Sequence, residues 1–264
     1  MKVGFIGAGN MASAIINGMR SKDIYEISVT DINDLALSKF KGKVEFVSDS
    51  AREVIKRSEY VVLAIKPYQY QDFLIEHQEL LKDKVVISIA AGISNEFMTK
   101  YTNDYLLVMP NTPSALGLGL TSIIENEKLD QEIFNKVVEL FKSIGEVEII
   151  KESDLETLIC LAGSAPAFFY LVIDAMAKYG ELHGIEKEKA TRIAANVMSA
   201  SAQMVLRQDE DSRTLADRVC SPNGSTIRAV EYFDNNGLDQ IFSGAMDACY
   251  HRAKEMKKEN DECL

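Results

Sequence analysis

The residue types and spacing with the clearest chemistry lie near the start of the chain. Gly7, Gly9 and Ala12 follow the β-rich run KVGFI in the order Gly-x-Gly-x-x-Ala, at the mouth of a predicted helix. In this order the first glycine permits a tight turn, the second leaves room for a pyrophosphate, and the small third residue lets the helix pack on the strand. The N–H groups at the start of the helix then face the diphosphate. We therefore expect a dinucleotide to contact Gly7, Ala8, Gly9, Asn10, Met11 and Ala12.

An acidic residue ends the second β-rich run, where the ribose of such a cofactor is expected. Asp31 follows the run EISVT, and no arginine or lysine comes after it until Lys39. A carboxylate at this place accepts hydrogen bonds from the ribose hydroxyls and repels the additional phosphate of NADP. We therefore expect NADH or NADPH as the cofactor, with a weak preference for NADH. The alternative is that Asp31 caps the helix that starts near Asn33.

Two further segments follow predicted strands and so belong to the same edge of a sheet. Ala64, Ile65, Lys66 and Pro67 end the fourth run, and we predict that they contact the cofactor. Lys66 either approaches the phosphates or ribose, or is an ordinary solvated lysine. In the segment MPNTPSALGLG, two prolines bracket Asn111 and Thr112 and stiffen the loop. We predict that Asn111 also contacts the cofactor.

The segment VCSPNGSTIRAV, residues 219–230, interrupts a region of otherwise helical pattern. It combines hydroxyls, a proline and a glycine, and it has no arginine before Arg228. At a helix N-terminus, free backbone N–H groups and hydroxyls bind an anion without a cation. An ordinary helix cap from Ser221 or Asn223 is the alternative interpretation.

The residues absent from the sequence limit its chemistry. The three histidines are isolated from every motif, and no G-x-S-x-G, H-E-x-x-H or P-loop lysine is present. We identify no catalytic acid or base and no metal site. A nicotinamide cofactor without such groups points to hydride transfer onto an activated acceptor, such as a protonated C=N bond, which needs placement more than a proton donor.

The pattern of predicted helices and strands that must position these residues changes near residue 151. Before it, β-rich runs alternate with helical patterns, which is typical of βαβ units and of a parallel sheet with helices on both faces. After it, the patterns are helical only. We predict an α/β fold with a Rossmann-type doubly wound domain over 1–151 and an all-helical substrate-binding and dimerisation domain over 152–264. The β-rich runs are KVGFI, EISVT, VEF, YVVLAI, KVVISIA, YLLVMP, LTSII and EVEII.

Composition excludes several other classes of protein. The 264 residues carry a formal charge of −11, which argues against a broad nucleic-acid surface. The four cysteines form no CxxC pair and no secretory signal is visible, so we expect a cytoplasmic protein with free thiols. The uncharged run 157–173 is shorter than the about 20 residues of a membrane span. We interpret it as a helix buried in protein, either by its own chain or at a subunit contact, and the large apolar faces of the helical half predict a homo-oligomer.

Segments along nearly the whole chain resemble the pyrroline-5-carboxylate reductase family, and they occur in the family's order. They are GFIGAGNMASAI at the start, AIKP at 64–67, ISIAAGI at 87–93, MPNTP at 109–113, GSAPAF at 163–168 and VCSPNGSTIRAVE at 219–231. The resemblance implies reduction of 1-pyrroline-5-carboxylate to L-proline by NAD(P)H, the last step of proline biosynthesis. It also implies a homodimer formed through the helical domain and, in many members, larger rings such as a decamer.

Under this resemblance the anion at the 219–230 loop is the substrate carboxylate, held by Ser221, Gly224, Ser225 and Thr226. The chain departs from the family at Asn223, where the usual loop has glycine, and at Ala162 and Ala165, where hydroxyls are more common. These departures favour an alternative interpretation, in which the protein is a non-catalytic or regulatory dinucleotide-binding homologue. A β-hydroxyacid dehydrogenase is a weaker alternative, because the first long helix of its second domain carries a catalytic lysine and residues 157–177 contain none.

Overall fold

The protein folds into two compact units in its computed structural model, which describes residues 1–22 and 24–263. Unit 1 contains Met1–Pro166 and the chain from Cys249 onward, whereas unit 2 contains Ala167–Ala248. This division follows packing alone. The functional boundary at residue 151 stays a prediction.

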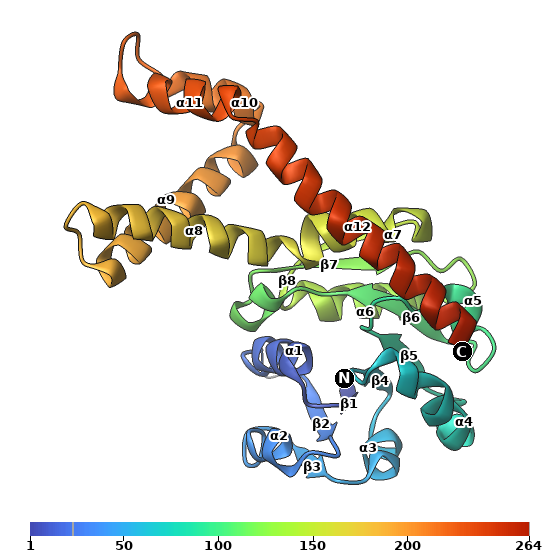
Figure 1. Cartoon of the computed structure of the whole chain (residues 1–264). Coiled ribbons are helices and arrows are strands. Elements are labelled where there is room, and N and C mark those ends of the chain that lie inside the picture. Colours follow the sequence, from blue (N-terminus) through green and yellow to red (C-terminus); the bar gives the residue numbers. More distant parts are fainter. Residues whose placement is uncertain (23, 264) are drawn as a thin grey trace. The chain divides into compact units, whose positions relative to one another are not determined.

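Unit 1 is built on one eight-stranded sheet with the strand order β3-β2-β1-β4-β5-β6-β7-β8 (Figure 1). Each of the eight β-rich runs marks a strand, although the run VEF overlaps its strand only at Phe46. The order of its first six strands is that of a dinucleotide-binding sheet, whose two halves meet between β1 and β4. The strands are β1 (Lys2–Ile6), β2 (Glu26–Thr30), β3 (Phe46–Ser48), β4 (Tyr60–Leu63), β5 (Val85–Ser88), β6 (Tyr105–Met109), β7 (Gly119–Ile124) and β8 (Gly145–Ile150).

The expectation of a parallel sheet is correct for β1 to β6 and wrong at β7. Strand β7 pairs antiparallel with β6 and parallel with β8, so the last two strands run against the others. The reason is the connection, residues 110–118, which holds only the short 3₁₀ helix η2 (Thr112–Leu116). A parallel crossover needs about a dozen residues or more, usually a helix.

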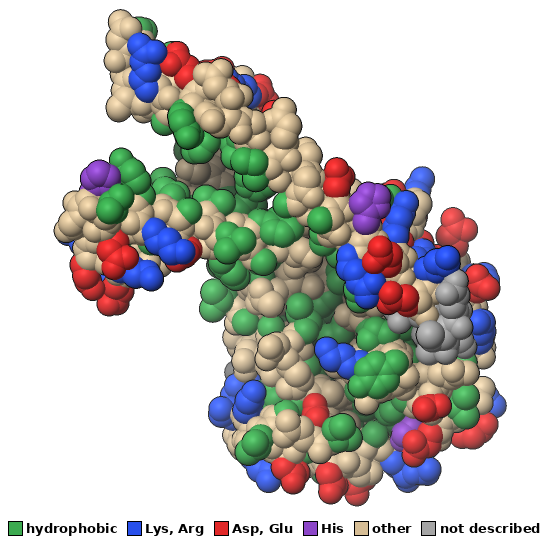
Figure 2. All heavy atoms as spheres, viewed as in Figure 1, with side chains coloured by type: hydrophobic (Ala, Val, Ile, Leu, Met, Phe, Trp, Pro, Cys, Tyr) green, Lys and Arg blue, Asp and Glu red, His purple; other side chains and the backbone are tan. Residues whose placement is uncertain are grey.

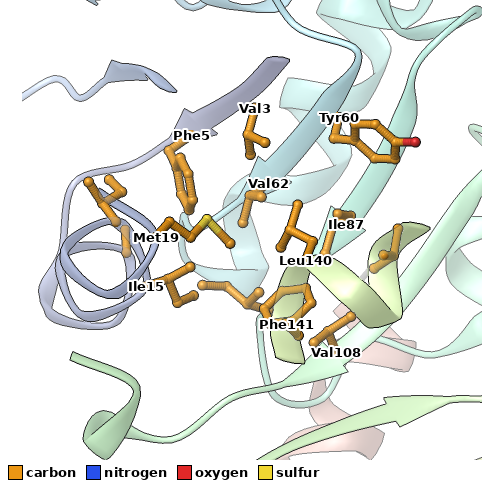
Figure 3. Close-up of a cluster of buried hydrophobic side chains, with 14 of the residues drawn as sticks. Val3, Phe5, Ile15, Met19, Tyr60, Val62, Ile87, Val108, Leu140 and Phe141 are labelled. Carbon is orange, nitrogen blue, oxygen red and sulfur yellow. The ribbon is translucent and has the colours of Figure 1, made fainter. Parts of the chain in front are cut away.

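Helices cover both faces of the sheet, as doubly wound packing requires. On one face, apolar side chains of α1 and α6 meet alternate residues of the strands; Figure 3 shows Phe5, Met19 and Phe141 pointing toward one another within this cluster. On the other face, α3, α4 and α5 cover the intervening strand residues. The helices are α1 (Asn10–Arg20), α2 (Asp34–Ser38), α3 (Ala51–Arg57), α4 (Tyr70–Leu81), α5 (Asn95–Met98) and α6 (Gln131–Lys142).

A helix with a π-helical turn follows the sheet. It consists of α7 (Leu155–Leu158), the π turn η4 (Ile159–Gly163) and α8 (Ala165–Leu182). The Ser164 N–H donates to the Ile159 carbonyl oxygen at 2.8 Å, which is the longer ring of a π turn. The last helix, α12 (Leu238–Cys263), returns to unit 1, where the Lys257 ammonium lies 3.5 Å from the Glu156 carboxylate.

Unit 2 packs helices through small residues. Its other helices are α9 (Lys187–Arg207), α10 (Ser212–Arg218) and α11 (Ser225–Asn235). Ala177 and Ala190 are buried, and a Cβ placed on Gly180 of α8 would lie 2.8 Å from the Cβ of Ala190 on α9. The two backbones therefore approach closely at this crossing, where any larger side chain would separate them.

Many large apolar side chains of the helical region are exposed, and hydrophobic atoms form much of its visible surface in Figure 2. The helical stretch Glu152–Leu182 is long and apolar enough to cross a membrane by length and composition, and 17% of its most apolar window is buried. A single chain therefore leaves much of this helix unburied, and its burial at a subunit contact stays a prediction. Exposed side chains on α8 and α9 include Phe169, Tyr170, Leu171, Met176, Tyr179, Leu182, Ile193, Val197, Met204, Val205 and Leu206.

Candidate functional site

A pocket of about 610 Å³ opens at the carboxyl edge of the sheet in unit 1. It lies where β1 and β4 end, at the switch point of the strand order, which is where open α/β sheets bind ligands. Six of the predicted cofactor residues line it: Gly7, Gly9, Asp31, Ala64, Ile65 and Lys66. The other lining residues are Ile6, Thr30, Ile32, Asp49, Ser50, Ala51, Arg52, Gln69, Phe73, Glu76 and His77.

The glycine-rich loop has the shape that a diphosphate needs. Gly7 has φ +104°, and a Cβ there would lie 2.6 Å from the Ala64 carbonyl oxygen, so only glycine fits. Gly9 borders open space, since a Cβ on this residue would have no other atom within 4 Å, and it begins α1 without a side-chain cap. The first N–H groups of α1 therefore remain available to an anion. These residues fit a dinucleotide.

The remaining four residues of the loop differ in their burial. Ala8 and Ala12 are both buried and pack in the core cluster beneath α1. Asn10 is exposed, Met11 is half-buried, and neither side chain lines the pocket. Contact of these four residues with the cofactor stays a prediction, and it would be made by their backbone.

Asp31 joins the glycine-rich loop to the end of β2. Its Oδ2 accepts a 2.6 Å hydrogen bond from the Ala8 N–H, and its Oδ1 accepts one of 2.8 Å from the Asn33 N–H. Helix α2 is capped instead by Asn33, whose Oδ1 accepts from the Leu35 N–H at 3.0 Å. The alternative in which Asp31 caps this helix is therefore wrong. Asp31 lines the pocket with its negative charge, and its contact with the ribose stays a prediction.

The end of β4 forms the opposite wall. Lys66 is exposed and lines the pocket, whereas Pro67 starts the 3₁₀ helix η1 (Pro67–Gln69) and does not line it. The buried Tyr70 fixes this edge, because its hydroxyl donates to the Leu63 carbonyl oxygen at 2.8 Å and lies 3.0 Å from Ser88 Oγ. Burial raises the pKa of the Tyr70 hydroxyl, which keeps it protonated as a donor.

Several lining residues were not predicted from the sequence. Ser50 and Arg52 begin α3, and Phe73 and His77 lie on α4. The His77 ring stacks on Phe73 at 4.4 Å between centroids, and its Nδ1 lies 3.0 Å from the Phe73 carbonyl oxygen. The available signal was topological, because the end of the third strand and the helix after the fourth share this edge in a doubly wound sheet.

Asn111 lies outside the pocket and has structural partners at both ends of its amide. Its Nδ2 donates to the Ala162 carbonyl oxygen at 3.2 Å, and its Oδ1 accepts from the Leu120 N–H at 3.0 Å. The residue is buried and ties the segment after β6 to the π turn and to β7. Its contact with the cofactor stays a prediction without geometric support.

The 221–226 loop is a turn that leads directly into α11. The Gly224 N–H donates to the Ser221 carbonyl oxygen at 2.9 Å, and Asn223 has φ +62°, the one positive value among the described residues other than glycine. Proline in the second place and a positive φ in the third are the pattern of a type II turn. A Cβ on Gly224 would lie 2.2 Å from Ser221 Oγ and 3.0 Å from the Ser221 carbonyl oxygen, so a larger residue here would displace the Ser221 side chain.

The N-terminus of α11 has no side-chain cap. Gly224 is the N-cap residue, and neither Ser221 nor Asn223 bonds to the first turn. The capping alternative is therefore wrong. Ser221, Ser225 and Thr226 are exposed, so the first N–H groups of an 11-residue helix and these hydroxyls are open to a ligand. Such a terminus attracts an anion through its free donors and its dipole.

Other catalytic groups are sparse in the described part of the chain. Within residues 1–22 and 24–263, no group of three His, Cys, Asp or Glu side chains is arranged to hold a metal ion. Each histidine ring lies against an aromatic ring that is close to it in the sequence. The partners are Phe73 for His77, Tyr179 for His183 and Tyr250 for His251.

Comparison with known proteins identifies the family of the chain. Residues 152–256 match the family model for pyrroline-5-carboxylate reductase dimerisation, and residues 2–92 match that for NADP oxidoreductase, coenzyme F420-dependent. The chain is 32% identical to the pyrroline-5-carboxylate reductase of Escherichia coli (strain K12), over 97% of this chain and 98% of the relative. The chain belongs to the pyrroline-5-carboxylate reductase family.

Solved structures of the family have the same fold. A pyrroline carboxylate reductase of Plasmodium falciparum, with NADP bound, has a TM-score of 0.88 at 25% identity over 97% of this chain and 98% of that one. The 1-pyrroline-5-carboxylate reductase of Streptococcus pyogenes has a TM-score of 0.86 at 32% identity over the same shares. The predicted fold class, a Rossmann-type domain followed by a helical dimerisation domain, is confirmed. Membership also excludes the β-hydroxyacid dehydrogenase alternative.

Proposed function

We propose that the protein reduces 1-pyrroline-5-carboxylate to L-proline with NAD(P)H, the last step of proline biosynthesis. It is an oxidoreductase of a family with named members in bacteria, archaea and plants. The observation that carries the proposal is the pairing, in one chain of this family, of an open glycine-rich pocket with an uncapped helix terminus. The first fits a dinucleotide and the second fits a carboxylate.

In the cofactor site, the protein's part is to bind and orient. The free N–H groups after Gly9 would hold the diphosphate, and Asp31 would accept hydrogen bonds from the ribose. Lys66 and Arg52 supply the positive charge at the pocket. When bound, the reduced nicotinamide supplies the hydride.

In the substrate site, the loop would hold the carboxylate next to the imine ring. The N–H groups of Ser225 and Thr226, with the hydroxyls of Ser221 and Thr226, are the candidate donors. The Gly224 N–H, also predicted as a donor, already bonds to the Ser221 carbonyl oxygen, so Gly224 contributes by shaping the turn. Charge-assisted bonds of this kind each contribute about 1.5 to 3 kcal/mol net, so a few of them can orient a small acid. A protonated imine already carries positive charge, so we assign no acid or base, and catalysis consists of placement.

The test is an assay that follows oxidation of NADH and of NADPH with 1-pyrroline-5-carboxylate. We expect turnover, which separates an enzyme from a non-catalytic or regulatory homologue. The variant Thr226→Ala should raise the KM for the imine by about tenfold through loss of one charge-assisted bond, with the KM for the cofactor unchanged. An unaltered imine KM would contradict the carboxylate assignment while leaving the reaction intact.

The family's dimerisation model over residues 152–256 supports self-association. We further propose that the dimers assemble into larger rings such as a decamer, and that the enzyme works in the cytoplasm without nucleic-acid or membrane partners. The net charge of −11 supports the absence of a nucleic-acid partner. Cys160, Cys220 and Cys249 form no disulfide within the described chain, which is typical of a reducing compartment.

A further inference from the structure

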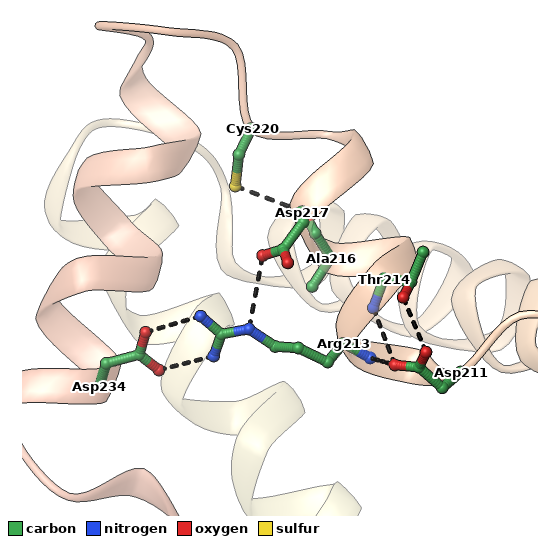
Figure 4. A network of polar contacts seen from close by, with 7 residues as sticks. All are labelled: Asp211, Arg213, Thr214, Ala216, Asp217, Cys220 and Asp234. Carbon is green, nitrogen blue, oxygen red and sulfur yellow. Dashed lines mark hydrogen bonds and ion pairs between the residues drawn. The ribbon is translucent and has the colours of Figure 1, made fainter.

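An arginine joins the two helices on either side of the substrate loop. The Arg213 guanidinium, in the first turn of α10, donates two 2.9 Å hydrogen bonds to the two carboxylate oxygens of Asp234, near the end of α11 (Figure 4). Its Nε lies 3.4 Å from Asp217 Oδ1 on α10. We call Arg213, Asp217 and Asp234 the brace. The hydrogen bond with Arg213 lowers the pKa of Asp234, so this carboxylate stays ionised well below neutral pH.

The start of α10 is fixed as well. Asp211 caps the helix by accepting hydrogen bonds from the Arg213 N–H at 3.0 Å and the Thr214 N–H at 2.9 Å. The Thr214 hydroxyl donates to the other Asp211 oxygen at 2.7 Å. The backbone that carries Arg213 is therefore held in one conformation, and Figure 4 shows the cap and the brace as one connected network.

Neither α10 nor α11 has a fully buried side chain in the described chain. Apolar packing therefore holds this helix pair weakly within the subunit, and the brace is the bidentate contact that spans it. Exposed ion pairs usually contribute little, but a two-pronged arginine–carboxylate pair with fixed geometry is the exception.

We infer that Arg213 is a positioning residue for substrate binding: the brace holds α11 against α10 so that the 221–226 loop presents its donors in one arrangement. This rests on the proposed function of that loop. Donors that are already in place cost less entropy to order when the anion arrives. Loss of the brace should therefore weaken binding of the imine carboxylate and leave the cofactor site in unit 1 unchanged.

The chain offers a matched control on the same helix. Arg218, at the end of α10, pairs with Glu210 in the segment before α10 rather than with a carboxylate of α11. Arg213→Gln and Arg218→Gln each remove one exposed arginine and one ion pair. They differ in whether α10 and α11 remain joined.

The experiment compares Arg213→Gln, Arg218→Gln and the charge exchange Arg213→Asp with Asp234→Arg in the full-length enzyme. We expect Arg213→Gln to raise the imine KM by about fivefold, with cofactor KM unchanged, and Arg218→Gln to leave both unchanged. The charge exchange should lower the imine KM from that of Arg213→Gln part of the way toward that of the parent enzyme. Hydrogen exchange of the segment 219–230 should accelerate in Arg213→Gln, whereas that of 187–207 should not.

An unchanged imine KM in Arg213→Gln, or an equal rise in Arg218→Gln, would overturn the inference. If the charge exchange fails to fold, Asp234→Asn gives the same test from the other partner. Hydrogen exchange distinguishes failure of the inference about Arg213 from failure of the proposed function. If Thr226→Ala leaves the imine KM unchanged, the loop is not the carboxylate site, but exchange in 219–230 still reports whether Arg213 orders it.

Discussion

The Asp31 carboxylate fixes the glycine-rich loop and also sets the charge of the pocket at the ribose end. Its hydrogen bond from the Ala8 N–H needs an acceptor, whereas repulsion of an additional phosphate needs the negative charge. Asp31→Asn removes the charge and keeps an acceptor. We expect the ratio of NADPH to NADH affinity to rise by about tenfold, because repulsion of the phosphate is lost.

Quenching of protein fluorescence by each cofactor measures this ratio without turnover. Asp31→Ser is the companion variant, since it removes both the charge and the acceptor for Ala8. It should shift the ratio in the same direction and also weaken binding of both cofactors. An unchanged NADPH to NADH ratio in both variants would contradict the ribose assignment.

Asn223 allows a second test at the level of one residue, because its φ of +62° is disfavoured for most side chains. Asn223→Gly should keep the loop, its imine KM and its melting temperature. Asn223→Ala should cost about 1 kcal/mol of backbone strain and raise the imine KM. Steady-state kinetics and thermal unfolding of the pair check this. Equal behaviour of the two variants would show that the left-handed conformation does not matter for binding.

Residues with a local signal could be predicted from the sequence, and the others could not. Gly7 and Asp31 each lie directly after a single strand, so local sequence is enough to predict their roles. The positive φ of Asn223 follows from its place in the 221–226 turn. Arg52 and His77 reach the pocket only because separate crossovers end at the same sheet edge. Asn111 is a converse case, since the structure gives this polar residue structural partners at both ends of its amide, and its contact with the cofactor stays a prediction.

At the level of elements, the crossing of α8 and α9 depends on a glycine. Gly180→Ala should destabilise the protein by about 1 kcal/mol or more, because the new methyl meets Ala190 at 2.8 Å and overpacking exceeds the gain in helix propensity. Adding Ala190→Gly returns the space and should recover most of the melting temperature. Thermal unfolding of the single and double variants measures this, and a Gly180→Ala protein as stable as the parent would contradict the close crossing.

Helices and strands were predicted well wherever the spacing of their apolar residues was unambiguous. All eight strands and the long helices follow from alternation and helical spacing. The direction of β7 did not follow, because it depends on the length of the connection in residues 110–118 rather than on the pattern of the strand. The π turn at 159–163 was also not predicted, because it lies inside a segment that has an ordinary helical pattern.

At the level of the whole molecule, one chain leaves too much apolar surface in water to be the complete structure. The exposed apolar side chains concentrate on the helices that match the dimerisation model. Hydrophobic association removes such surface, at about 25 cal/mol per Å² buried. The sequence predicted the association from composition, but it could not predict how small a share of the most apolar window within 152–182 its own chain would bury.

A stripe of α9 provides the test of this association. Ile193 and Val197 are separated by one helical turn and are about half exposed, at 47% and 53%. Replacing both with glutamate should leave the fold of a single chain intact and convert the oligomer to a monomer, because a buried unpaired charge is costly at an interface. Leu35→Glu, an exposed apolar residue of unit 1, is the control and should stay associated. Sedimentation equilibrium distinguishes the outcomes, and an intact oligomer in the double variant would show that this stripe faces solvent.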